Sequence, residues 1–225
     1  MPILLHLDTA VAGASVALSE GSALLGEKRF DGPRDSAAWI QVAIRDLVQE
    51  AGRSLSDLDA VSVTAGPGSY TGLRVGLATA KGLCYALGRP LIALPTLEVM
   101  AAAAGAVEGL LCPMIDARRM EVFTAVYDHA GNEVRPVQAL VLDEHCFSDL
   151  LEAGPVTFFG NGAPKWQGLV PHPNAHFQVV DYAARHAVAL AERAFSAGRF
   201  MDLAYGEPLY GKEFYTPQRP PVVRI

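Results

Sequence analysis

A glycine-rich stretch is the part of the sequence with the most specific potential for chemistry. Residues 64–76 read TAGPGSYTGLRVG, after an apolar run typical of a buried strand and before a run with helical spacing. Glycines between a strand and a helix let backbone N–H groups converge at the helix N-terminus, where they can hold an anion. The stretch is neither a Walker A loop nor a G-x-G-x-x-G fingerprint, and no lysine follows in the P-loop position. Its residues therefore favour a structural tight turn over a phosphate site.

Acidic residues at two strand ends are the next candidates. Asp8 and Asp116 each follow an apolar run. In ATP-hydrolysing proteins of the ASKHA fold, which the order of elements described below resembles, carboxylates at such strand ends handle the metal ion and the attacking water, and glycines beside them let phosphates approach. Neither has a glycine close behind it, so side chains occupy the place where phosphate oxygens would approach the backbone. We therefore expect both aspartates to cap turns, and we expect weak or absent ATP hydrolysis.

Histidines and cysteines show no convincing metal or disulfide pattern. His172 and His176 have the spacing that would place them on one helix face, but Pro173 and Asn174 between them favour a turn. No metal site is therefore predicted. The cysteines are scattered, with no C-x-x-C pair, which indicates reduced thiols in a cytoplasmic protein. They are Cys84, Cys112 and Cys146.

Composition is that of a globular protein. The chain has 225 residues, of which 51% are hydrophobic and 19% charged, and its net charge is -6. This length can bury one large core or two lobes of about 100 residues each. The acidic balance argues against a broad basic surface, so an RNA substrate would have to be held by another chain. The start lacks a signal peptide and no apolar run has membrane-spanning length, so we expect a cytoplasmic protein without membrane contact.

Hydrophobic periodicity predicts two halves of similar build. Strands are expected at residues 3–7, 14–18, 24–30, 60–65, 91–94, 110–116, 121–128, 137–142 and 156–159. Helices are expected at residues 36–51, 71–87, 96–104, 144–153 and 181–197. Each half thus approaches the order βββαβα, which resembles the α/β ASKHA fold of actin, sugar kinases and Hsp70. The predicted lobes are residues 1–104 and residues 105–225, the latter with an irregular tail.

Several motifs resemble the TsaB (YeaZ) family, and the likeness extends over nearly the whole chain. Residues 66–76 resemble its signature G-P-G-S-[FY]-T-G-[LV]-R-[IV]-G. Residues 115–123, IDARRMEVF, resemble its I-D-A-R-x-x-E-V-Y motif, and residues 160–163, GNGA, resemble a late glycine turn. Two departures occur. The closing P-x-Y-L-R motif reads PLYGK here, and the usual histidine–serine pair before the first helix is missing.

This resemblance implies a non-catalytic scaffold and dimerisation subunit of the complex that puts threonylcarbamoyl on tRNA adenosine. A TsaD-like catalytic subunit would be the direct partner, a TsaE-like ATPase would bind the assembled pair, and tRNA would be reached through the complex. Alone, the subunit would form a homodimer. No catalytic residue, metal or cofactor is expected, apart from a nucleotide that could lodge at the partner interface. Two alternatives stay open. One is a stand-alone ASKHA-type ATPase or kinase or M22-type peptidase, and the other is a homodimeric binding module unrelated to tRNA.

The partner surface is predicted on the two helices that follow residues 34 and 70. Small residues recur every four positions in the second of these helices and form a smooth ridge that lets another helix approach closely. In the first helix, Trp39 lies beside the apolar stripe, where it can stay partly exposed. The resemblance favours these helices as the interface, with the predicted residues Trp39, Gly72, Leu73, Gly76, Ala80 and Cys84. The alternative is that the ridge packs on the chain's own sheet.

Overall fold

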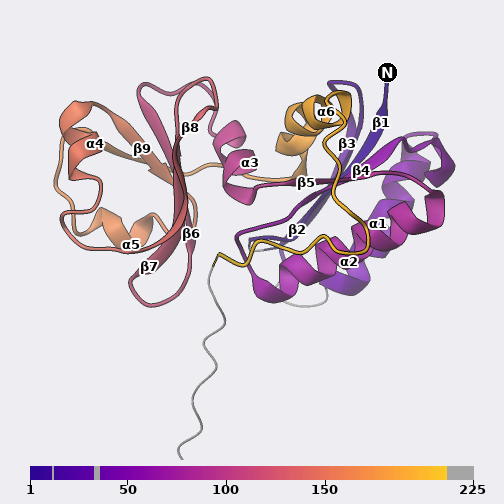
Figure 1. Ribbon diagram of the computed structural model, residues 1–225, viewed down its shortest axis with the longest axis horizontal. Coiled ribbons are helices and arrows are strands. Elements are labelled where there is room, and N and C mark those ends of the chain that lie inside the picture. The colour runs from indigo at the N-terminus through magenta and orange to yellow at the C-terminus, as the bar shows by residue number, and fades with distance from the viewer. Residues whose placement is uncertain (12, 33–35, 212–225) are drawn as a thin grey trace, which may run out of the picture.

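The computed structural model describes residues 1–11, 13–32 and 36–211. In these ranges the chain forms two lobes, each built on a five-stranded mixed sheet, with α3 (Thr96–Ala103) between the lobes (Figure 1). No helix of these ranges is long and apolar enough to cross a membrane. The architecture is α/β, as the sequence predicts.

The sheet of the first lobe has the strand order β3-β2-β1-β4-β5. Its strands are β1 (Ile3–Asp8), β2 (Ala14–Glu20), β3 (Ala23–Phe30), β4 (Ala60–Thr64) and β5 (Leu91–Leu94). The central strand β1 pairs antiparallel with β2 and parallel with β4, and each of its residues is buried. A strand that is buried on both faces needs helices on both sides of its sheet.

Two helices cover one face of this sheet, α1 (Ser36–Glu50) and α2 (Tyr70–Leu87) (Figure 1). The apolar stripe of α1 is buried and joins β1 and β2 in a core cluster, with Ile40, Ile44 and Leu47 at its centre. Gly88 ends α2 in the left-handed conformation with φ of +63°, which is the usual role of a C-terminal glycine.

The other face of the first sheet is covered by the end of the chain, and this corrects the predicted lobe boundary. A short 3-10 helix, η2 (Ala184–Ala187), leads into α6 (Val188–Ser196), and both pack on the first lobe. Leu190 and Ala191 of α6 share a core cluster with Leu4 and Ile92. The described residues after about 182 therefore belong to the first lobe, not to a second lobe of residues 105–225. The physical reason is that α1 and α2 cover one face only, and the second face also needs apolar cover.

The sheet of the second lobe has the order β10-β9-β6-β7-β8. Its strands are β6 (Leu110–Asp116), β7 (Glu121–Tyr127), β8 (Glu133–Val141), β9 (Val156–Phe159) and β10 (Ala175–Gln178). Two short helices, α4 (Ser148–Ala153) and α5 (Pro164–Gln167), pack around an aromatic core that includes Trp166 and Phe158. Neither β10 nor α5 was expected from the sequence, because each has only four residues.

Candidate functional site

Loops that follow parallel strands of both sheets meet in the cleft between the lobes. Residues after β1, β4, β6, β9 and β10 line two cavities of about 480 and 570 Å³. Val11 and Asn161 line both of them. Open α/β sheets hold ligands at the carboxyl ends of their strands. The cleft is therefore one candidate site, and the outer side of α1 and α2 is the other.

The glycines of the signature stretch, residues 66–76, are required by neighbouring backbone. A Cβ atom on Gly68 would lie 2.1 Å from the carbonyl oxygen of Ala10, and one on Gly72 would lie 2.0 Å from that of Thr9. Both carbonyls belong to the turn that follows β1. Ser69 begins α2 by accepting a hydrogen bond from the Gly72 N–H at 3.2 Å. The stretch is thus a structural tight turn, which its residue types favoured over a phosphate site.

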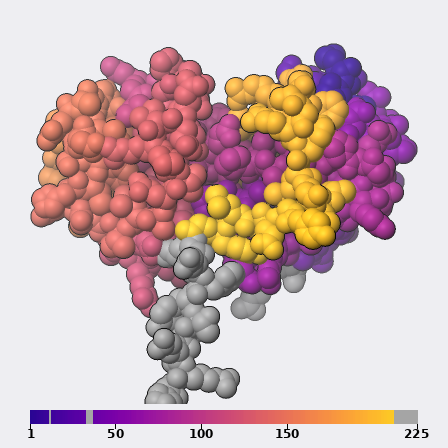
Figure 2. Space-filling model, in the orientation of Figure 1, coloured from indigo at the N-terminus to yellow at the C-terminus, as the bar shows by residue number. Residues whose placement is uncertain are grey.

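A C-terminal strap, residues 202–211, closes over the same stretch. The Leu209 N–H donates to the Ala65 carbonyl oxygen at 2.7 Å. Gly66 has φ of +118°, and a Cβ atom there would lie 2.1 Å from the Leu209 carbonyl oxygen. Next along the strap, the Tyr210 ring packs 5.2 Å from the Tyr70 ring at the start of α2. Figure 2 shows this segment in yellow, crossing from the first lobe to the border of the second.

The carboxyl group of Asp8 is enclosed at the end of β1. It accepts hydrogen bonds from the Thr64 hydroxyl at 2.6 Å and from the Ala10 N–H at 3.0 Å. Burial raises the pKa of Asp8 above its ordinary value. Burial and the Asp8 charge also raise the pKa of Tyr182 well above its ordinary value. The Tyr182 hydroxyl nevertheless forms no hydrogen bond of ordinary geometry within the described ranges. Asp8 therefore caps a turn, as predicted.

Asp116 occupies the matching position at the end of β6 but is exposed. Its carboxylate accepts a hydrogen bond from the Arg118 N–H at 2.5 Å and forms an ion pair with Lys165. The Lys165 ammonium holds the pKa of Asp116 below its ordinary value. This aspartate also caps its turn, as predicted. Arg118 and Arg119 in that turn have φ of +70° and +52°, values that non-glycine residues seldom adopt.

The histidine and cysteine predictions concern groups away from the cleft. The His172 ring accepts a hydrogen bond from the Asn174 N–H at 3.2 Å, so this segment forms the predicted turn and not a helix. No cluster of three or more His, Cys, Asp or Glu that could hold a metal occurs in the part of the chain that the structure describes. The three cysteines are free, and burial raises the pKa of Cys84 to about 11 and that of Cys112 to about 12.

The small-residue ridge of α2 faces the chain's own sheet, which corrects the predicted partner surface. Leu73, Ala80 and Cys84 are fully buried. A Cβ atom on Gly76 would lie 2.3 Å from the Thr9 hydroxyl oxygen, so this glycine lets α2 approach the end of β1. The four-residue spacing was read correctly, but small residues allow close approach to a sheet as well as to a partner helix. The ridge therefore packs on the chain's own sheet, which is the alternative given above.

The other two predicted interface residues lie at the edge of the same core. Gly72 is half-buried against the turn after β1. Trp39 is half-buried, packs against the core cluster of the first sheet and stacks on Phe30 with 5.5 Å between ring centroids. Trp39 is thus partly exposed, as expected, but its ring serves the fold of the monomer.

The outer side of α1 and α2 exposes a different set of residues, which we name the two-helix face. The Gln41 side-chain amide donates to the Thr79 hydroxyl at 3.2 Å and joins the two helices there. Val42 is 47% exposed and Tyr85 is 84% exposed, unusually high fractions for large apolar side chains. Arg45 is exposed on the same side of α1, one helical turn from Gln41 and Val42. The face consists of Ala38, Gln41, Val42, Ala78, Gly82 and Tyr85.

Sequence reasoning missed this face, although it carries a readable signal. Ala78 and Gly82 are also small residues four positions apart, and they lie two positions away from the buried ridge. The repeat of small residues from Gly72 to Cys84 is longer and is therefore the stronger pattern in the sequence. In a helix, the positions that alternate with a buried stripe point outward, so the exposure of Ala78 and Gly82 follows from the burial of Gly76 and Ala80.

Comparison with known proteins gives one consistent family. A family model described as "TsaD: tRNA N6-adenosine threonylcarbamoyltransferase" matches residues 32–152, which is more than half of the chain. The chain belongs to this family, as a TsaB-like member. It is 29% identical to the tRNA threonylcarbamoyladenosine biosynthesis protein TsaB of Escherichia coli, over 92% of this chain and 93% of that protein. It is 28% identical to TsaB of Bacillus subtilis, over 85% of each.

The fold agrees with the sequence likeness. The structure of YeaZ from Pseudomonas aeruginosa superposes with a TM-score of 0.80 at 28% identity, covering 93% of this chain and 100% of that one. The fold is of the ASKHA type, as the order of elements predicts. The TsaB (YeaZ) resemblance read from residues 66–76 and 115–123 is thereby confirmed.

Proposed function

We propose that the chain acts in tRNA threonylcarbamoyladenosine biosynthesis as a non-catalytic scaffold that binds and activates a TsaD-like catalytic subunit. The names of its relatives support the pathway. The single observation that carries the scaffold role is the two-helix face, on which the large side chains of Val42 and Tyr85 are exposed. Aromatic side chains are enriched at the core of protein interfaces, and an exposed apolar patch often marks such a surface.

The cleft supports the absence of catalysis by this chain alone. Asp8 is enclosed by Thr64 and by the turn after β1, and Asp116 is paired with Lys165. Both carboxylates are thus engaged in capping and pairing, which leaves neither poised to activate water. Carbonyl oxygens of this chain fill the space beside the signature glycines, so a phosphate group cannot approach the backbone there. The chain accordingly works without a catalytic residue, metal or cofactor of its own.

In the proposed assembly, the chain binds beside the catalytic subunit. The two-helix face pairs with the TsaD-like subunit, or with a second copy when the chain is alone. A TsaE-like ATPase binds the assembled pair, tRNA is reached through the complex, and a nucleotide can lodge at the subunit boundary. Beyond the backbone of its own helix, Gly82 has no atom within 4 Å of where its Cβ would be, so a partner can come close to the α2 backbone there.

Capture of the TsaD-like subunit tests this proposal. Gly82→Leu adds a bulky side chain in open space, so it should leave the fold intact and hold the partner away. A loss of about 3 kcal/mol would weaken capture about a hundredfold. Gly168→Leu is the matched control, because Gly168 also has open space around its Cβ position and an ordinary φ of -75°, but lies on the second lobe.

Two results would count against the proposal. One is the absence of any complex between the wild-type chain and the TsaD-like subunit in light scattering after size exclusion. The other is normal capture by Gly82→Leu, which would move the interface elsewhere. Metal-dependent ATP or peptide hydrolysis by the pure chain, abolished by Asp8→Ala, would favour the alternative of a stand-alone ATPase, kinase or peptidase.

A further inference from the structure

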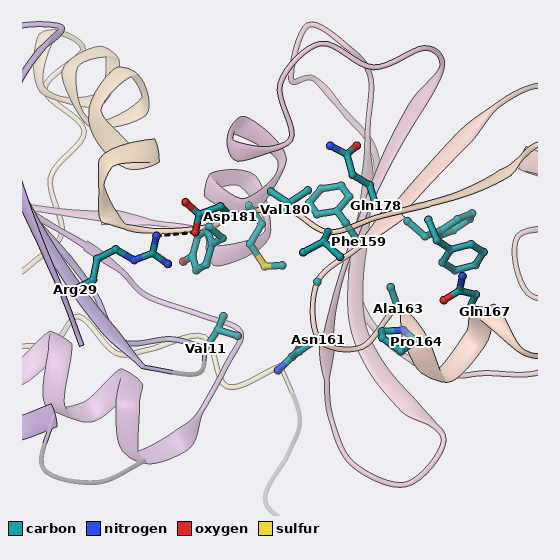
Figure 3. Close-up of a pocket in the computed structure, with 16 residues that line it drawn as sticks. Val11, Arg29, Phe159, Asn161, Ala163, Pro164, Gln167, Gln178, Val180 and Asp181 are labelled. Atoms are coloured by element: carbon teal, nitrogen blue, oxygen red, sulfur yellow. Dashed lines mark hydrogen bonds and ion pairs between the residues drawn. The ribbon is translucent and has the colours of Figure 1, made fainter. Parts of the chain in front are cut away.

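A groove of about 560 Å³ lies at the outer edge of the first sheet, beside β5. Its walls come from β5, from the first turn of α3, from α6 and from the residues that follow α6 (Figure 1). The cavity between the lobes, which Figure 3 shows, has no lining residue in common with this groove. The groove is therefore a separate feature of the molecule, and it also lies apart from the two-helix face.

The strand β5 is at the edge of its sheet, so half of its backbone groups point away from β4. The carbonyl oxygens of Pro90 and Leu94 accept hydrogen bonds from the β4 side, at 3.2 and 2.9 Å. Because residues alternate along a strand, Leu91 and Ala93 direct their backbone groups to the outer edge. The Met201 N–H donates to the Leu91 carbonyl oxygen there at 2.8 Å. Ala93 has no backbone partner among the described residues.

The chain does not continue this pairing along β5. Since Met201 lies opposite Leu91 in an antiparallel bridge, Arg199 would have to lie opposite Ala93. The Arg199 N–H instead donates to the Ala194 carbonyl oxygen at 2.9 Å, so the residues before Met201 belong to the closing turn of α6. The edge of β5 thus accepts one antiparallel residue and stays open at the next position.

The sequence of β5 does not protect this open edge. Charged residues and proline on edge strands commonly prevent pairing with another chain. The edge strands β3 and β8 follow this rule, with Lys28 and Pro136 respectively. The strand β5 reads LIAL and has neither. An extended segment of another chain can therefore add to the sheet at Ala93, which is a common mode of peptide recognition.

A carboxylate and an aromatic ring lie beside the open backbone. Glu98 lines the groove from the first turn of α3, and its carboxylate forms no ion pair or hydrogen bond in the part of the chain that the structure describes. Burial raises the pKa of Glu98 above its ordinary value, although the charges of Arg193 and Arg199 oppose this shift. Phe200 is 46% exposed in the groove, and its ring packs edge-to-face on Phe195 at 5.9 Å. A half-buried carboxylate without a partner favours a cation.

We propose that this groove binds an extended segment of a partner protein, and that the segment presents an arginine. The backbone of the segment pairs with the N–H and carbonyl groups of Ala93 and adds a short strand to the first sheet. The apolar stem of its arginine lies against Phe200, and the guanidinium group pairs with Glu98. This proposal does not rest on the scaffold role, because no residue of the two-helix face takes part in it.

Nuclear magnetic resonance titration of the full chain with the blocked peptide acetyl-TVRVT-amide tests the proposal. The peptide should bind with a Kd of about 1 mM or lower and shift the amide signal of Ala93. A peptide with citrulline in place of arginine keeps the shape without the charge and should bind at least tenfold more weakly. Glu98→Gln should weaken binding of the arginine peptide to a similar extent. The control is Glu152→Gln, which removes the same charge from an exposed position of α4 and should bind as the wild type does.

Methylation of the peptide backbone tests the strand pairing separately from the charge. Only alternate residues of an added strand direct their N–H groups to the sheet. One peptide therefore carries N-methyl groups on both valines, and another carries one on the arginine. One of these two peptides should lose binding, and the other should keep it to within about threefold.

Four results would overturn the proposal. They are no saturable binding of the arginine peptide, binding that leaves the Ala93 amide signal unchanged, equal binding to the wild type and to Glu98→Gln, and equal loss in the two methylated peptides. Two more results would assign the groove to this protein itself and not to a partner. One is tenfold tighter binding of the peptide RPPVVRI, the last residues of the chain. The other is weaker self-association of Glu98→Gln in light scattering, which would indicate a second copy.

Discussion

Gly76 lies on the buried side of α2 and Gly82 on its exposed side, so replacing each by alanine should change stability differently. A Cβ atom at Gly76 would lie 2.3 Å from the Thr9 hydroxyl oxygen, whereas at Gly82 no atom lies within 4 Å. Thr9 cannot easily move away, because it is 2% exposed and its hydroxyl donates to the Gly72 carbonyl oxygen at 2.7 Å. Replacing either glycine by alanine gains about 1 kcal/mol of helix propensity.

Because that gain is common to both variants, the difference between them measures the cost of the contact with Thr9. Overpacking a filled core costs about 1–3 kcal/mol. For a chain of this size, 1 kcal/mol shifts Tm by about 2–4 °C. Gly82→Ala should therefore melt about 2–12 °C above Gly76→Ala, and above the wild type as well. Differential scanning calorimetry measures both. Equal melting temperatures, or a lower one for Gly82→Ala, would refute the assignment of the two sides of α2.

Three further predictions test other parts of the structure. Lowering the pH from 7 to 5 should reduce the free energy of unfolding in urea titrations by about 2 kcal/mol, because burial lowers the pKa of His6 to about 3 in the folded chain, whereas His6 of the unfolded chain protonates near 6.5. His6→Gln should remove this loss of stability. The same loss in His6→Gln would show that His6 is not its source. Gly66→Ala should expose the strap to proteolysis, whereas Gly52→Ala, at a positive φ in open space, should not; equal cleavage would contradict the tight contact. Lys165→Met should raise the pKa of Asp116 in an NMR titration, and an unshifted carboxylate would show that their ion pair is absent in solution.

Most elements of the fold were predictable because their signals are local. The run from Ile3 to Leu7 is apolar apart from His6, and β1 is buried on both faces. The helix α2 begins at Tyr70, one residue from its expected start, because Ser69 caps it. The return of α6 to the first lobe was not predictable. Its apolar stripe shows that the helix packs on something, but not on which sheet.

Prediction of the site was limited for a similar reason. The turn-capping role of Asp8 and Asp116 follows from local sequence. Glycine is required at positions 66, 68 and 72 because carbonyl oxygens from the turn after β1 and from the strap leave no room for a Cβ atom. Those carbonyl groups are far away in the sequence. Spacing of small residues identifies a smooth helix surface. It does not say whether that surface meets the chain's own sheet or a partner, and this ambiguity produced the misplaced ridge.

The most direct test of the scaffold role is threonylcarbamoyladenosine formation in a reconstituted reaction. The reaction contains tRNA, threonylcarbamoyl-adenylate, the TsaD-like subunit and the TsaE-like ATPase, with or without this chain. We predict that the chain alone modifies no tRNA, that its omission abolishes modification, and that Gly82→Leu behaves as an omission while Gly168→Leu supports the full rate. A full rate without the chain, or modification by the chain alone, would contradict the account.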